Sequence, residues 1–184
     1  MSRPLKVMGV LAVVLLLAGI WVQISQKSNP LELIVSKHGE IVKDDFVYRI
    51  YTERDTYQEG DSVTLISELE YVGDRKFVTI LHEATPFHYG ISENSGKYAF
   101  YYMMNQPAIR TTLIKGQPFR ESYTSPGALI VEEGVTLPTK QAEVPFPAGQ
   151  YHVSGYAKFT VSEVDGKEEG DFKIGKDLTF EVGK

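Results

Sequence analysis

From residue 46 onward the chain alternates apolar and polar side chains with a period of two, and no segment there keeps a helical period. Successive side chains of a β-strand point to opposite faces, so this alternation is typical of strands with one face in a core. The alternating segments are residues 46–51, 63–71, 76–82, 87–92, 98–104, 151–161 and 178–182. The pattern predicts an all-β fold for this region.

Residues typical of tight turns separate the predicted strands. They are Glu59-Gly60-Asp61, Gly73-Asp74, Asn94-Ser95-Gly96, Lys115-Gly116, Asp165-Gly166 and Gly175. Residues 72–75 and 164–167 predict tight hairpins in which glycine supplies a positive φ. About eight or nine short strands joined by such turns predict an antiparallel β-sandwich, with a closed barrel as the alternative.

Residues 126–149 interrupt this rhythm. Pro126, Pro138, Pro145 and Pro147 fall within the stretch, and proline has no N–H to donate to a ladder. We expect a long irregular crossover between the two sheets, a kind of connection that often carries function.

An uncharged apolar run occupies residues 7–24, with Arg3 and Lys6 before it. A helix of this length spans about 27 Å, close to the thickness of a bilayer core. Because the basic residues precede the run, positive-inside orientation predicts a cytoplasmic N-terminus and an extracytoplasmic chain after about Ser25. We therefore predict a single-pass protein of the cell membrane. Its predicted parts are a cytoplasmic N-terminus at 1–6, a transmembrane signal anchor at 7–24, a stalk and first short strand at 25–45, and a sandwich at 46–184.

A cleaved signal peptide and a buried helix of a soluble domain are the alternatives to this anchor. Leu17-Ala18-Gly19 has the form of a lipoprotein signal, but Ile20 stands where the lipidated cysteine would be. Trp21, Val22, Gln23 and Ile24 follow, whereas signal peptidase needs small residues at its cleavage site. These residues favour an uncleaved anchor.

The composition excludes several function classes. The chain has no cysteine, which excludes thiol nucleophiles, cysteine-ligated zinc and iron–sulfur clusters. Its net charge of −5 becomes −7 beyond residue 24, because Arg3 and Lys6 no longer contribute. A nucleic-acid-binding surface needs a basic face, so no nucleic-acid partner is expected.

The residues offer no recognisable catalytic, metal or cofactor motif. Neither a G-x-S-x-G elbow nor a phosphate-binding glycine loop occurs, and both are the usual signatures of their chemistry. The nearest group of metal ligands is His82, Glu83 and His88, with His152 as a further member, and its spacing is not a zinc signature. The paired acids are Asp44-Asp45, Glu132-Glu133 and Glu168-Glu169, which we interpret as solvated surface groups. We therefore predict neither an enzyme nor a bound cofactor.

Segment 98–104 has more aromatic residues than a strand with one buried face requires. Alternation places Tyr98, Phe100, Tyr102 and Met104 on the core face and leaves Tyr101 and Met103 on the opposite face. Tyrosine and methionine are common at recognition surfaces. Tyr101 and Met103 are therefore the candidate partner contact, and a strand covered on both faces is the alternative.

Segments in both halves of the predicted sandwich share features with a known domain family. They are residues 57–65, Gly73-Asp74 followed by Val78-Thr79-Ile80, residues 87–91 with Gly96, residues 113–116 and residues 147–155. Together they resemble the intracellular proteinase inhibitor (BsuPI) type immunoglobulin-like domain of bacilli, over roughly Phe46 to Val161. The resemblance implies an immunoglobulin-like sandwich, usually found in extracytoplasmic proteins, and carries no inhibitory residue over to this chain.

These observations predict a membrane-anchored extracytoplasmic binding or accessory module with no catalytic activity. Its partners would be the membrane, through the anchor, and a protein or cell-envelope component. A protease-inhibitor-like protein and an envelope-associated enzyme with an unrecognised site are the alternatives.

The predicted topology can be tested with intact spheroplasts. We expect externally added protease to digest the domain after residue 24, because positive-inside orientation places it outside. A cytoplasmic marker protein should survive the same treatment. Recovery of a mature protein that begins near Ser25 from the culture medium would contradict the uncleaved anchor.

Overall fold

The alternating segments form strands in two sheets, which the computed structural model describes over residues 39–134, 136, 138–161 and 170–184. The first sheet has the order β1-β2-β4-β9, with bounds Gly39–Lys43, Phe46–Thr52, Thr64–Tyr71 and Phe119–Thr124. The second has the order β10-β7-β6-β11-β12-β3, with bounds Leu129–Ile130, Tyr98–Ala99, Phe87–Glu93, Gly149–Val161, Gly170–Gly183 and Thr56–Gln58. β5 (Phe77–His82) extends the second sheet by pairing with both β11 and β8 (Ile109–Ile114). The described domain is an all-β sandwich.

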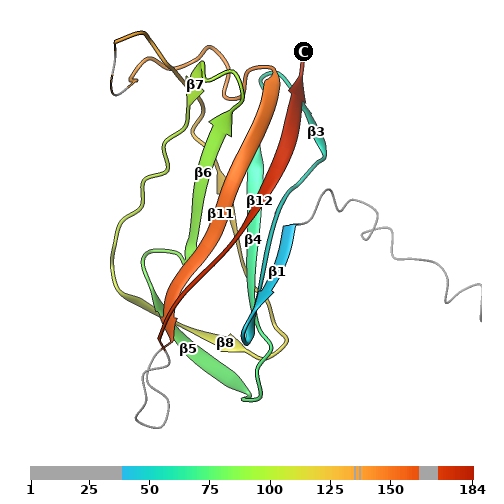
Figure 1. Ribbon diagram of the computed structural model, residues 1–184, viewed down its shortest axis with the longest axis vertical. Helices are drawn as coiled ribbons and strands as arrows, with labels where there is room; N and C mark the ends of the chain where they lie inside the picture. The colour runs from blue at the N-terminus through green and yellow to red at the C-terminus, as the bar shows by residue number, and fades with distance from the viewer. Residues whose placement is uncertain (1–38, 135, 137, 162–169) are drawn as a thin grey trace, which may run out of the picture. The chain divides into compact units, whose positions relative to one another are not determined.

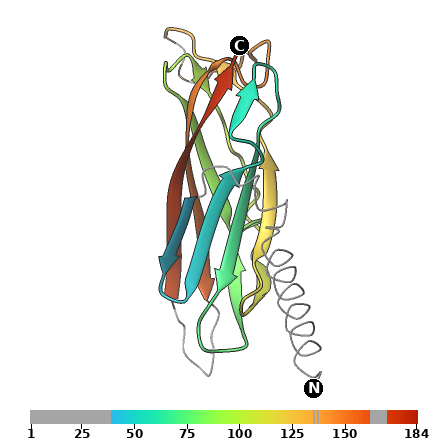
Figure 2. The same ribbon diagram turned by 90° about the vertical axis from the view of Figure 1, so that its right-hand side faces the viewer.

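The core lies between the two sheets (Figures 1 and 2) and consists largely of the predicted inward faces. In β11, burial alternates so that Tyr151, Val153 and Phe159 are among the buried positions. Aromatic rings join the sheets, since Phe46 of β2 lies 4.8 Å from Phe159, centroid to centroid. Because strands of separate sheets contribute these rings, the sandwich and not the closed barrel is the observed architecture.

Arg49 holds the first three strands of the first sheet together on their outer face. Its guanidinium lies 2.6 Å from a carboxylate oxygen of Glu40 on β1 and 2.7 Å from one of Glu70 on β4. Glu40 and Arg49 are register partners, so the short strand β1 is fixed to β2 by side chains as well as by its ladder. The described part of this sheet thus includes β1, which lies within the stretch 25–45 where a first short strand is predicted.

The predicted hairpin at residues 72–75 is wrong. β4 and β5, which flank it, belong to different sheets, and Gly73 is not among the residues with positive φ. A Cβ on Gly73 would overlap an Asp45 carboxylate oxygen and lie 2.5 Å from the Tyr71 hydroxyl oxygen. Glycine is needed here for close packing, because the chain leaves one sheet and enters the other at this point.

The other turn predictions have mixed outcomes. Gly60, Gly96 and Gly116 lie in turns, as predicted, and the structure shows that all three have positive φ. Gly175 is not a turn residue, since it lies inside β12 opposite Tyr156. The hairpin predicted at 164–167 lies outside the described residues. The pairing of β12 with β3 is parallel, which departs from a purely antiparallel sandwich.

Residues 126–149 form the predicted crossover from β9 in the first sheet to β11 in the second. Its described residues are irregular apart from β10, which pairs with β7, and an isolated bridge between Leu129 and Gln141. Its Phe146 is buried and stacks on Phe100 at 5.0 Å between ring centroids. The crossover therefore covers one end of the core (Figure 1).

The predicted membrane anchor at residues 7–24 lies outside the described residues. Within the part of the chain that the structure describes, no helix is long and apolar enough to cross a bilayer.

Gly155 offers a test of how closely the sheets approach each other. A Cβ at this position would overlap Ile50 Cδ1 and lie 2.9 Å from the Tyr48 hydroxyl oxygen, both on β2. We expect Gly155→Ala to lower the free energy of unfolding by about 1–3 kcal/mol, the usual cost of overpacking a core.

Gly90 on the neighbouring strand β6 is the matched control. A Cβ there has its nearest neighbour, the Ser154 carbonyl oxygen, at 3.8 Å. Gly90→Ala should stay within about 0.5 kcal/mol of the parent protein. Urea unfolding of both variants measures the difference, and equal effects would contradict the close approach.

Candidate functional site

Two short ladders at the ends of one long hairpin share a single register. Ser92 of β6 pairs with Ala99 of β7, and His82 of β5 pairs with Ile109 of β8. In an antiparallel register, each residue added along one strand is matched by one residue fewer along the other. Continuing the Ser92–Ala99 register in this way leads directly to the His82–Ile109 pair. Residues 83–91 and 100–108 lie between these pairs and are equally long, yet strand pairing does not join these two described stretches. We call residues 100–108 the strap.

Prolines account for part of this interrupted ladder. In the shared register Pro86 lies opposite Asn105, and Pro107 lies opposite Ala84. Proline cannot donate a ladder hydrogen bond and is found mainly at edges and bulges. A single long contact of 3.4 Å, from the Ala84 N–H to the Asn105 carbonyl oxygen, crosses this part of the gap.

The Tyr102 side chain connects the strap to β6 near the N-terminal end of the strap. Its hydroxyl donates to the Phe87 carbonyl oxygen at 2.8 Å, and the Phe87 N–H donates to Thr85 Oγ1 at 3.1 Å. The Tyr102 ring also meets the rings of Tyr89 and Tyr123 edge-on, at 5.4 and 5.0 Å. Side chains therefore satisfy the Phe87 backbone groups, which a strand would otherwise pair. Burial raises the pKa of Tyr102 to about 12.

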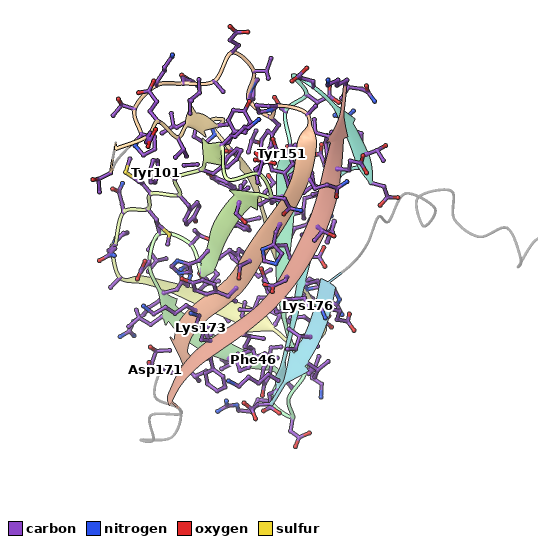
Figure 3. The ribbon with its side chains drawn as sticks, turned by 45° about the horizontal axis from the view of Figure 1, so that its top comes forward. Phe46, Tyr101, Tyr151, Asp171, Lys173 and Lys176 are labelled. Atoms are coloured by element: carbon purple, nitrogen blue, oxygen red, sulfur yellow. The ribbon has the colours of Figure 1, made fainter. Side chains whose placement is uncertain are left out.

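The strap keeps the side-chain alternation predicted from the sequence, although it is not a strand. Regular pairing ends at Ala99, which contradicts the predicted strand over 98–104. Phe100 and Tyr102 are half-buried and pack against the core. Tyr101 is 42% exposed and Met103 is 92% exposed. The two candidate contact residues thus face solvent from the strap, and Figure 3 labels Tyr101 there.

A cavity of about 560 Å³ lies beside the C-terminal end of the strap. Four segments distant in sequence line it: 81–83 at the end of β5, 106–108 of the strap, 158–160 of β11 and 171–173 of β12. Its charged groups are two ammonium groups and two carboxylates, contributed by Lys158, Lys173, Glu83 and Asp171. Figure 3 shows Asp171 and Lys173 at the beginning of β12.

The charged groups of the cavity are held by partners of unequal strength. Lys158 Nζ lies 3.7 Å from Glu83 Oε1, and both side chains are partly exposed. Asp171 accepts a hydrogen bond of 2.6 Å from Thr160 Oγ1. The short bond orients the Asp171 carboxylate, whereas the longer ion pair leaves the Lys158 ammonium able to take another partner.

A row of stacked side chains continues from the cavity across the outer face of the second sheet. His88 stacks on Tyr156, with ring centroids 4.8 Å apart and planes 5° from parallel. Lys173 Nζ lies 4.1 Å from the centroid of the same Tyr156 ring, a cation–π distance. Burial lowers the pKa of His88, and its Nε2 atom is enclosed without a hydrogen-bond partner among the described residues.

The structure separates the histidines considered as metal ligands. His82 is buried, and its ring nitrogens lie 2.7 Å from the Glu83 carbonyl oxygen and from Thr111 Oγ1. His88 is stacked on the outer face, and His152 faces Asp177 at 3.4 Å. Within the described ranges no three metal-ligating side chains come together.

The two pairs of acids that the structure describes are not part of the cavity lining. Asp44-Asp45 forms the turn between β1 and β2, where Asp44 has a φ of 52°. Glu132-Glu133 is exposed, with Glu132 3.8 Å from Lys140. Glu168-Glu169 lies outside the described residues.

Comparison with known proteins adds no assignment. No family model matches the chain, and its sequence matches no curated protein.

The two strap tyrosines should differ sharply in their effect on stability. Tyr102→Ala removes a half-buried ring and the hydrogen bond to Phe87, and we expect it to cost about 2–3 kcal/mol, less than a fully buried aromatic residue. Tyr101→Ala is the matched control and should stay within about 0.5 kcal/mol. Urea unfolding checks both values, and equal costs would show that Tyr102 does not bridge the gap.

Proposed function

We propose that this chain is a membrane-anchored extracytoplasmic binding or accessory module without catalytic activity. The apolar run at 7–24, preceded by Arg3 and Lys6, supports the anchor. The β-sandwich is compatible with an immunoglobulin-like domain of the BsuPI type, as the sequence resemblance implies. The proposed partner is a protein or a cell-envelope component.

The main support for this proposal is the exposure of Met103 and Tyr101 on a strap that Tyr102 attaches to β6. Met103 is 92% exposed, the highest value among the large apolar side chains that the structure describes as exposed. Its neighbour Tyr102 fixes the strap to β6, so Tyr101 and Met103 are presented from a partly immobilised segment. Holding a contact surface in place before binding reduces the entropy lost on association.

The acidity of the domain supports the choice of partner. The chain carries 24 acidic and 19 basic residues, so a nucleic-acid partner is not proposed. Tyrosine and methionine are enriched in protein interfaces, where a few side chains dominate affinity. A protein or envelope surface with an apolar pocket fits this pair of side chains.

Crosslinking from intact membranes tests the proposal. We expect Tyr101→Ser combined with Met103→Ser to reduce recovery of the crosslinked partner at least about tenfold, since hot-spot side chains cost upwards of about 2 kcal/mol. The melting temperature should be unchanged, because both side chains face solvent.

Val42→Ser combined with Val131→Ser is the matched control. These valines are 61% and 43% exposed and lie outside the strap. The control should recover the partner at the parent level. Equal recovery from the strap variant and the parent protein would refute the contact assigned to Tyr101 and Met103.

A further inference from the structure

The cavity beside the strap contains a pair of like charges placed directly opposite each other. Lys158 of β11 and Lys173 of β12 are register partners, and both line the cavity. Like charges directly opposite on neighbouring strands are destabilising unless another group offsets them. Two lysines therefore extend from opposite positions on neighbouring strands, and a negative group between their ammonium groups would offset this repulsion.

The surroundings neutralise this pair only in part. Lys158 has Glu83 at 3.7 Å, which is beyond ordinary hydrogen-bond length. Lys173 lies over the Tyr156 ring, and within the described part of the chain no carboxylate comes within 4.0 Å of its Nζ. A cation–π contact leaves the charge of the ammonium in place. Among the described residues, the ammonium of Lys173 thus has no carboxylate partner.

The rest of the lining suits a compact polar ligand. Asp171, oriented by Thr160, offers a carboxylate acceptor, and Gln106 of the strap offers an amide that both donates and accepts. Leu81 and Pro107 add apolar surface. A volume of about 560 Å³ falls within the usual range for small-ligand sites.

We propose that this cavity binds a compact ligand through a carboxylate group held between Lys158 and Lys173. Asp171 and Glu83 then face the donor groups of the same ligand, such as hydroxyl or amide groups. The carboxylate belongs either to the C-terminus of a peptide or to an acidic sugar. This inference rests on the proposed binding role and assigns it a second contact, separate from Tyr101 and Met103.

Calorimetric titration of the full-length chain in a neutral detergent tests the inference. The probes are N-acetyl-alanyl-alanine and its C-terminal amide for the peptide source, and glucuronic acid and glucose for the sugar source. We expect one acid to bind at least about tenfold more tightly than its neutral counterpart, since hydrogen bonds to charged groups are the stronger ones. The acid that does so identifies the source.

Variants assign the binding to the lysine pair. Lys158→Met and Lys173→Met should each weaken binding of that acid at least about tenfold. Lys176→Met is the matched control, because Lys176 is an exposed lysine of the same strand outside the cavity lining (Figure 3). It should bind like the parent protein.

Two outcomes would overturn the inference. One is that neither acid binds more tightly than its neutral counterpart, a comparison that needs no variant. The other is that the lysine variants, with parent-like melting temperatures, bind the acid unchanged. If the strap variant still loses its crosslinked partner in that case, the proposed function stands and only the carboxylate site fails.

Discussion

The antiparallel pairing of β11 with β12 is the interaction on which the other parts of the domain depend. It runs without interruption from Gly149 opposite Val182 to Val161 opposite Gly170. β6 pairs along the first half of β11, and β5 pairs at its far end. Because one long strand serves both partners, it fixes the register of β5 and β6 together.

This shared support explains how an interrupted ladder can exist in a stable sheet. β5 and β6 run in the same direction along β11, so residues 83–86 between them need no strand partner of their own. The Lys158 N–H donates to the Pro86 carbonyl oxygen at 2.8 Å, which keeps the connection attached to β11. The strap can therefore leave the sheet without loosening β5 or β6. The polar cavity lies at the place where it does so.

Local patterns in the sequence predicted much of the sandwich, because alternation depends only on which face of a strand is buried. Residues 151–161 show this well, since every second side chain from Tyr151 to Val161 is buried. In residues 63–71 the same alternation holds except at Ile66, which is buried on the opposite face. Gly73 shows the limit. A glycine beside an aspartate has the same local appearance in a hairpin and in a passage between sheets, and the difference lies in Asp45, a residue distant in sequence.

The candidate site was predictable only in part for the same reason. Alternation identified Tyr101 and Met103 as outward-facing, and the exposure of both follows from it. The cavity depends on four separate segments and on the register that sets Lys158 opposite Lys173. Pro86 and Pro107 were the available signal of an interrupted ladder, but their meaning requires knowing that their strands face each other.

The common register of the two ladders has a consequence for local stability. Since the strap contributes no strand pairs, its separation from β6 breaks side-chain contacts such as the Tyr102 bridge and leaves both flanking ladders whole. When the strap packs against β6 again, its register with β6 is already set, because Ala99 and Ile109 stay paired throughout. Backbone amide hydrogens of residues 100–108 should consequently exchange with solvent through a small local opening, while those of β11, which has strand partners on both sides, exchange only through larger unfolding.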